Sequence, residues 1–194
     1  MANSWRRFCS SVSEHPFERS VRVAAPAELA ARFFADRETW FRLNPEWEVL
    51  EYAAGHLKLR YERSEEEVEC RPASADFSAT GGTVIFDTDP PRRIALSWLP
   101  EGDGVTHLSY RETFAAPLED ARRAELNLWL DAAAGYLAIA ARTDRKGKFM
   151  RWLLDRFWLR MSPTSRRVSL LIVGMEALAL LLFIAVLIIY RLTA

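Results

Sequence analysis

Histidines and carboxylates are the side chains here most suited to acid–base or metal chemistry. The three histidines, His15, His56 and His107, fall in unrelated segments, and none has zinc-ligand spacing to a cysteine. The sequence contains no glycine-rich phosphate loop and no serine in a strand-to-helix elbow motif. The acidic run 64–67 is typical of a solvated hairpin end. We therefore predict no catalytic set, no metal site and no cofactor.

Aromatic side chains are more informative, since the chain has seven tryptophans and eleven phenylalanines. They either fill an ordinary core or line an apolar pocket for a hydrophobic small molecule. On the second interpretation the candidate ligand-binding residues are Trp98, Trp129, Tyr136 and Arg111. Arg111 and Glu112 are neighbours on one predicted strand and so project from opposite faces. Alternation alone does not decide which face is concave.

The elements that must position these residues follow one another in a regular order. Period-two alternation predicts a strand at 17–24, and a helix runs from Ala25 until Asn44-Pro45 ends it. Antiparallel strands separated by turn signals come next, and a six-turn helix follows them. The strand segments are 47–55, 56–70, 81–89, 92–100 and 105–114, and the helix covers 117–142. On that helix Glu125, Trp129, Ala132, Tyr136 and Ile139 share one side. This order indicates an α+β fold.

Three local sequences within this order resemble the START-like (SRPBCC) superfamily. They are APAELAARFFADRETWFRLNP (25–45), THLSYRETFAAP (106–117) and NLWLDAAAGYLAIAAR (127–142). The resemblance covers residues 16–143 and is strongest to polyketide cyclase/dehydrase-like and lipid-transport-like members. It implies a helix-grip fold, in which a curved antiparallel sheet wraps around a long C-terminal helix and a deep apolar cavity. Residues 1–15 form an N-terminal arm outside it.

A long apolar segment follows the domain. Residues 168–190 contain one ionisable side chain, Glu176. As a helix this segment is roughly 34 Å long, enough to cross a hydrocarbon core of about 30 Å. We predict a single-pass, tail-anchored protein with a short tail, 191–194. Glu176, beside Gly174 and Ala177, is either a helix–helix contact, through self-association or with other membrane subunits, or a protonated residue tolerated in a monomeric anchor.

The segment 144–167 is a basic collar before the span, with eight basic and two acidic residues. The positive-inside rule then predicts a cytoplasmic domain, and no N-terminal signal peptide competes with it. Arginine supplies 23 of the 26 cations, as in GC-rich bacteria, so the expected location is a bacterial inner membrane. Cys9 and Cys70 form no disulfide framework, in keeping with a reducing compartment.

Charge is distributed unevenly, which bears on partners. Residues 1–143 carry 17 basic and 23 acidic groups, so nucleic acid is not an expected partner. The collar mixes cations with aromatic residues, which is typical of a helix lying among anionic lipid headgroups. The alternative is a linker helix whose aromatic residues pack on the domain. The candidate membrane-surface residues are Lys148, Arg151, Trp152, Arg156, Phe157, Trp158 and Arg160.

Three functions fit these observations. The favoured one is a membrane-anchored START-like domain that binds or transfers a lipid, quinone or polyketide-like molecule. The second is an accessory or assembly subunit of a membrane complex, docked through the span and the collar. The third, a cyclase or aromatase, is the least supported because no acid–base set converges.

Overall fold

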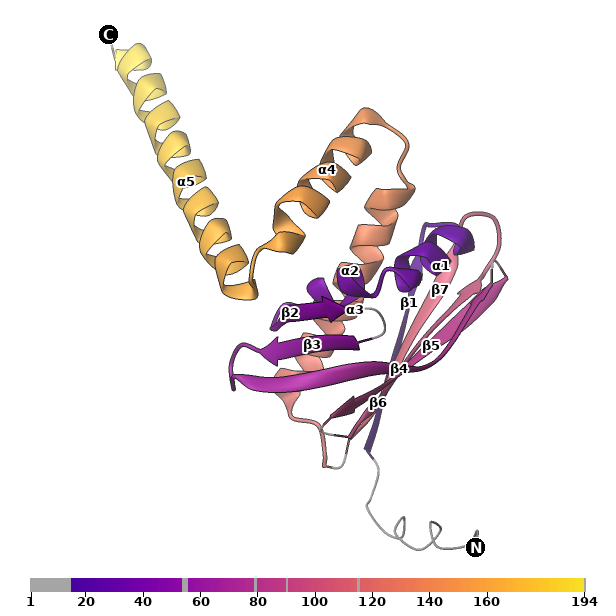
Figure 1. Ribbon diagram of the computed structural model, residues 1–194. Helices are drawn as coiled ribbons and strands as arrows, with labels where there is room; N and C mark the ends of the chain where they lie inside the picture. Colours follow the sequence, from indigo (N-terminus) through magenta and orange to yellow (C-terminus); the bar gives the residue numbers. More distant parts are fainter. Residues whose placement is uncertain (1–14, 54–55, 79, 90, 115, 194) are drawn as a thin grey trace, which may run out of the picture.

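The computed structural model describes residues 15–53, 56–78, 80–89, 91–114 and 116–193. Nearly all of the predicted N-terminal arm, with Cys9, lies outside this range. Seven strands form one antiparallel sheet in the order β1-β7-β6-β5-β4-β3-β2 (Figure 1). The strands are β1 (His15–Val23), β2 (Trp47–Ala53), β3 (His56–Tyr61), β4 (Glu66–Ser78), β5 (Gly81–Asp89), β6 (Arg93–Pro100) and β7 (Thr106–Phe114). The α+β class is confirmed.

Strand β4 gives the sheet its curvature. It is 13 residues long and pairs with β3 through its first part and with β5 along most of its length. The pairing with β5 shifts register between Pro72 and Ser74, a bulge that bends the strand. The predicted segment 56–70 divides at a turn over residues 62–65, where Glu65 adopts φ 56°. The turn is largely exposed, so the solvated hairpin end is confirmed.

Two short helices close one end of the sheet, where the sequence predicted a single helix. Helix α1 (Ala27–Ala35) and helix α2 (Arg37–Arg42) meet at Asp36, whose φ of −84° and ψ of 80° break the helical path. The Asp36 carboxylate then accepts a hydrogen bond from the Thr39 amide and caps α2. The break turns Trp40 and Phe41 into the core.

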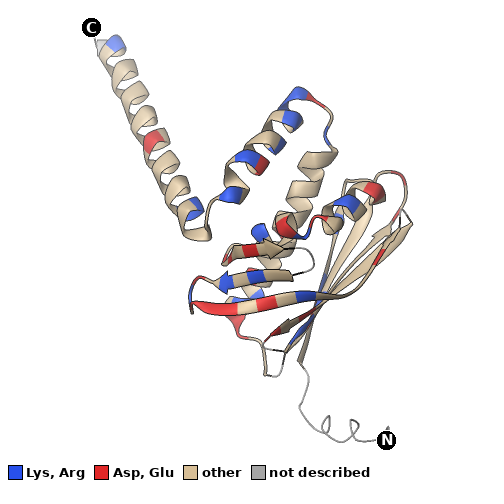
Figure 2. Cartoon of the chain, in the orientation of Figure 1, with Lys and Arg blue, Asp and Glu red and all other residues tan. Residues whose placement is uncertain are grey.

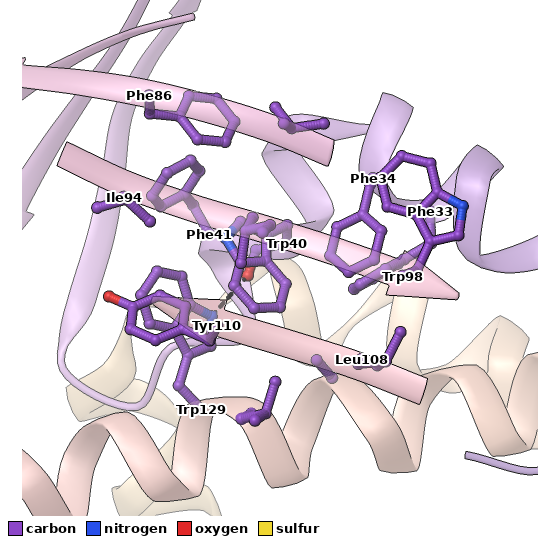
Figure 3. Close-up of a cluster of buried hydrophobic side chains, with 14 of the residues drawn as sticks. Phe33, Phe34, Trp40, Phe41, Phe86, Ile94, Trp98, Leu108, Tyr110 and Trp129 are labelled. Carbon is purple, nitrogen blue, oxygen red and sulfur yellow. Dashed lines mark hydrogen bonds between the residues drawn. The ribbon is translucent and has the colours of Figure 1, made fainter. Parts of the chain in front are cut away.

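Helix α3 (Asp120–Ala141) packs along the inner face of the sheet (Figure 1). Its sheet-facing side is Leu126, Trp129, Leu130, Ala133 and Leu137, at three- and four-residue spacing. A cluster of aromatic rings fills the space between α3, α2 and the sheet (Figure 3). The Trp40 and Trp129 rings stack with centroids 4.6 Å apart, and Trp129 Nε1 donates to the Trp40 carbonyl at 3.0 Å.

Three helical segments follow the domain: α4 (Arg145–Arg156), the short η2 (Trp158–Arg160) and α5 (Pro163–Thr193). In Figure 1, α4 and α5 diverge as the arms of a V. Helix α5 begins with proline, whose missing N–H costs nothing in a first turn. It is 31 residues long, which exceeds the predicted span of 168–190 at both ends. Every residue from 170 to 192 is exposed.

Candidate functional site

A pocket of about 340 Å³ lies between the start of α3 and the β2–β4 end of the sheet. Its volume is at the lower end of the range for small-molecule sites. The apolar part of its wall comes from elements far apart in the sequence: Trp47, Val68, Phe114, Ala116, Pro117 and Leu118. The polar part consists of Tyr61, Ser64, Glu66, Arg92, Glu119 and Arg122. The pocket is thus mainly apolar, with two guanidinium groups in its wall.

Arg122 is held rigidly in this wall. Its Nη1 lies 2.6 Å from both carboxylate oxygens of Glu125, one turn further along α3. Its guanidinium carbon lies 5.3 Å from the ring centroid of Trp47 and 5.5 Å from that of Tyr61, a double cation–π arrangement. Burial opposes the charge of Arg122, but the nearby Glu125 and Glu112 carboxylates outweigh it and raise its pKa. Arg122 is therefore a fixed, fully charged donor.

Glu112 is buried behind the pocket, on the inner face of β7. The Tyr110 hydroxyl donates to its Oε2, and Arg92 Nη1 lies 3.7 Å from its Oε1. Burial raises the pKa of Glu112, and the opposing effects of Arg122, Tyr110 and Arg92 do not cancel that rise. Burial also raises the pKa of Tyr110, so its phenol stays protonated and can donate.

The structure does not place the four predicted ligand-binding residues in the wall of this pocket. Trp98 stacks on Phe34 at 5.0 Å and is fully buried. Trp129 lies one layer behind the pocket, because its ring contacts Trp47 at 6.0 Å. Both are well-packed core residues (Figure 3).

Tyr136 and Arg111 differ further from expectation. Tyr136 packs on Phe33 at 5.4 Å and donates to Asp155 of α4 at 2.9 Å, so it joins α3 to α4. Arg111 is exposed on the outer face of the sheet, away from the pocket. The physical reason is the pleat of β7, which turns Tyr110 and Glu112 inward.

The residues predicted to meet the membrane surface form α4 and the turn after it. Lys148, Arg151, Arg156 and Arg160 are exposed, and basic residues are spread along α4 (Figure 2). Trp152 is 52% exposed, and its ring lies 5.8 Å from Phe149 and 5.4 Å from Phe157. Trp158 is half-buried. The helix packs on α3 and yet leaves this aromatic group uncovered, so membrane contact stays a prediction.

The first turn of α5 is fixed to the domain by charged groups. Glu62, in the β3–β4 turn, accepts from the Thr164 amide and hydroxyl at 2.9 Å each. Glu46 binds Arg167 at 2.8 Å and Arg63 at 2.9 Å. Burial would raise the pKa of Glu46, but its hydrogen bonds from Arg63 and Arg167 outweigh burial and lower it. We call this contact the α5 joint.

Helix α5, over Pro163–Leu192, is long and apolar enough to cross a membrane. Gly174, Glu176 and Ala177 are all exposed within it. Among the described residues none covers this part of the helix, so a contact at these positions stays a prediction. The described residues also contain no cluster of three or more potential metal ligands.

The sequence interpretation missed the pocket residues Tyr61, Arg92 and Arg122. One signal was present: Arg122 occupies the first turn of α3, where the helix dipole disfavours a cation, three residues before Glu125. A cation placed there needs a compensating carboxylate, and Glu125 supplies it. The convergence of Tyr61 and Arg92 on the same place depends on the curvature of the sheet, which local patterns do not encode.

Comparison with known proteins gives likeness at the level of structure. No family model matches the sequence, and no curated protein does. A conserved protein from Geobacillus kaustophilus superposes with a TM-score of 0.53 at 9% identity, over 66% of this chain and 98% of that one. A START superfamily protein from Mycobacterium smegmatis superposes with a TM-score of 0.46 at 18% identity, over 63% and 97%.

The Zhui aromatase/cyclase from Streptomyces sp. R1128 superposes with a TM-score of 0.45 at 19% identity, over 67% of this chain and 97% of that one. Identities this low bear on the fold alone. The described domain has one antiparallel sheet, in which β1 pairs with β7 and the sheet curves around the long helix α3. The described domain is therefore a curved antiparallel sheet around one long helix, the helix-grip arrangement that the sequence resemblance implies, and a candidate membrane-spanning helix follows it.

Proposed function

We propose that this protein is a membrane-anchored domain that binds a hydrophobic small molecule and exchanges it with the bilayer. The observation that carries the proposal is the pocket beside α3, whose wall is mainly apolar and contains a few fixed polar groups. This combination suits a ligand with an apolar body and a small polar end. Fold likeness alone would not be sufficient, because one fold supports many functions.

The attachment of α5 supports exchange with a membrane. Tyr61 and Ser64 line the pocket, and Glu62, which lies between them in sequence, holds the first turn of α5. One rim of the pocket therefore belongs to the turn that carries the anchor. The exposed cations and aromatic rings of α4, the helix that precedes α5, suit a headgroup layer. The basic flank of the span supports a cytoplasmic orientation of the domain, by the positive-inside rule.

Native mass spectrometry of the full chain, extracted in mild detergent, tests the proposal. Leu118→Trp places a large ring in the pocket, because Leu118 is half-buried in its wall. Leu128→Trp is the matched control, since Leu128 is exposed on helix α3 and does not line the pocket. We expect a bound lipophile in the wild type and in Leu128→Trp, and none in Leu118→Trp. Equal occupancy in all three would refute a ligand role for this pocket.

One observation favours a second function, that of a subunit in a membrane complex. Glu176 is an ionisable residue within an apolar helix that no described element covers (Figure 2). A partner helix with a hydrogen-bonding group would satisfy it. Co-purification of other membrane proteins that is lost in Glu176→Leu and kept in the neighbouring control Met175→Leu would support this role. Retention in both variants would argue against it.

A further inference from the structure

The pocket contains hydrogen-bond donors that no described residue satisfies. Arg122 Nη2 and Trp47 Nε1 are both buried, and neither has a hydrogen-bond partner among the described residues. Both residues line the pocket. Buried donors in folded proteins are nearly always paired. Trp40 Nε1 and Trp98 Nε1 are also unpaired among the described residues but lie in the packed core, whereas Arg122 and Trp47 border a space that a ligand acceptor can enter.

Arg92 adds a third donor group, and its charge is poorly compensated. It lines the same pocket, and its nearest carboxylate oxygens belong to Glu112 at 3.7 Å and Glu66 at 4.0 Å. Neither oxygen is within hydrogen-bond distance. Arg122 differs, because Glu125 lies 2.6 Å from it. Burial raises the pKa of Glu112, although Arg122, Tyr110 and Arg92 act to lower it. A raised pKa favours the neutral carboxyl, which compensates the charge of Arg92 less well.

We propose that the ligand is an amphiphile with a carboxylate headgroup, such as a fatty acid, that Arg92 and Arg122 bind together. The inference rests on the proposed ligand role of the pocket. A carboxylate offers about four acceptor sites in one plane and matches the planar donor edge of a guanidinium. Its negative charge also compensates Arg92, and the apolar chain lies against Val68, Phe114 and Leu118. A neutral alcohol would leave the cation uncompensated.

Equilibrium binding to the full chain in nanodiscs of neutral lipid tests this choice, with empty nanodiscs as background. The probes are dodecanoate and dodecanol, which share one chain length and differ in the headgroup. The variant is Arg92→Gln, and the matched control is Arg93→Gln. Arg93, the next residue along the chain, is exposed on the outer face and pairs with Asp87 at 3.0 Å. Thermal unfolding of both variants checks that they fold.

We expect the wild type and Arg93→Gln to bind dodecanoate at least about tenfold more tightly than dodecanol, the effect of one hydrogen bond to a charged group. In Arg92→Gln the affinity for dodecanoate should fall to that for dodecanol, with dodecanol unchanged. Equal binding of both probes by the wild type would overturn the carboxylate inference and leave the proposed function standing. Binding of neither probe would overturn both. If Arg92→Gln does not fold, Arg122→Met provides the same comparison.

Discussion

Replacing two buried tryptophans by phenylalanine should have unequal effects, although both side chains are almost completely buried. Trp129 Nε1 donates to the Trp40 carbonyl at 3.0 Å, whereas Trp98 Nε1 is buried with no hydrogen-bond partner among the described residues. Phenylalanine removes the indole N–H in both cases. Trp129→Phe loses a made hydrogen bond, and Trp98→Phe removes a donor that is already unsatisfied.

The expected difference follows from these environments. Loss of the hydrogen bond from Trp129 costs about 1 kcal/mol of unfolding free energy. The cost is small for a buried bond, because the Trp40 carbonyl keeps a second donor, the Leu43 amide at 3.3 Å, and is not left unpaired. Removal of the unpaired Trp98 donor relieves a desolvation cost of about 1–3 kcal/mol. The loss of ring volume destabilises both variants, and Trp129 contacts more aromatic rings. We expect Trp129→Phe to be the less stable variant by about 2 kcal/mol.

Urea unfolding of the full chain in non-ionic detergent, followed by tryptophan fluorescence, measures this difference. The dependence of unfolding free energy on urea should keep the same slope, so the midpoints report stability. Equal midpoints, or a lower midpoint for Trp98→Phe, would refute the reasoning. Either result would mean that the Trp98 indole has a partner in solution or that ring packing, and not hydrogen bonding, dominates both sites.

Three further predictions concern the α5 joint and the core. The Thr164 amide donates a hydrogen bond to the Glu62 carboxylate at 2.9 Å, so Glu62→Gln should speed hydrogen exchange at this amide. An unchanged exchange rate would show that the joint does not form in solution. The pKa of Glu46 is lowered, so its ion pairs stabilise the fold above its unfolded pKa of about 4.3 and lose this effect as the pH falls toward the folded value. The gap in melting temperature between wild type and Glu46→Gln should therefore narrow from pH 6 to pH 3, and a constant gap would contradict this. Burial raises the pKa of Cys70 to about 12, so iodoacetamide at pH 8 should label its peptide at least about a hundredfold more slowly in the native protein than in urea, and comparable rates would exclude a buried thiol.

Local patterns were sufficient to predict most of the secondary structure. The strands β5, β6 and β7 alternate cleanly and end at glycine or proline turns, and the sequence predicted each of them to within about two residues. The split between α1 and α2 was missed because no glycine or proline marks it. Asp36 breaks the helix and caps the next one with its own side chain, and that arrangement depends on where Trp40 and Phe41 can be buried.

The predicted side of α3 shows why the pocket was harder to find. Helical spacing grouped Glu125, Trp129 and Tyr136, but the helix rests on the sheet through Leu126, Leu130 and Leu137 as well. The side predicted to face the sheet is therefore offset around the helix axis from the side that does, and at its edge Tyr136 contacts α4 instead. Large aromatic residues suggested a cavity, and the structure uses most of them to fill the core. A cavity is the space that side chains leave, so residue type alone predicts it poorly.

The charge pattern of the chain joins the domain to the first turn of the candidate membrane-spanning helix. Glu46 and Glu62 give the acidic domain a negative edge beside the first turn of α5, and the basic collar supplies Arg167 to meet it. The other cations of the collar, along α4, are exposed, and on the proposed function they meet anionic lipid. A domain held in this way cannot rotate freely about the anchor while the joint is formed.

Loosening the joint by Glu62→Gln should therefore slow ligand exchange with the bilayer and leave equilibrium affinity unchanged, because Glu62 does not line the pocket. A fall in affinity instead would show that the Glu62 side chain itself contributes to ligand binding.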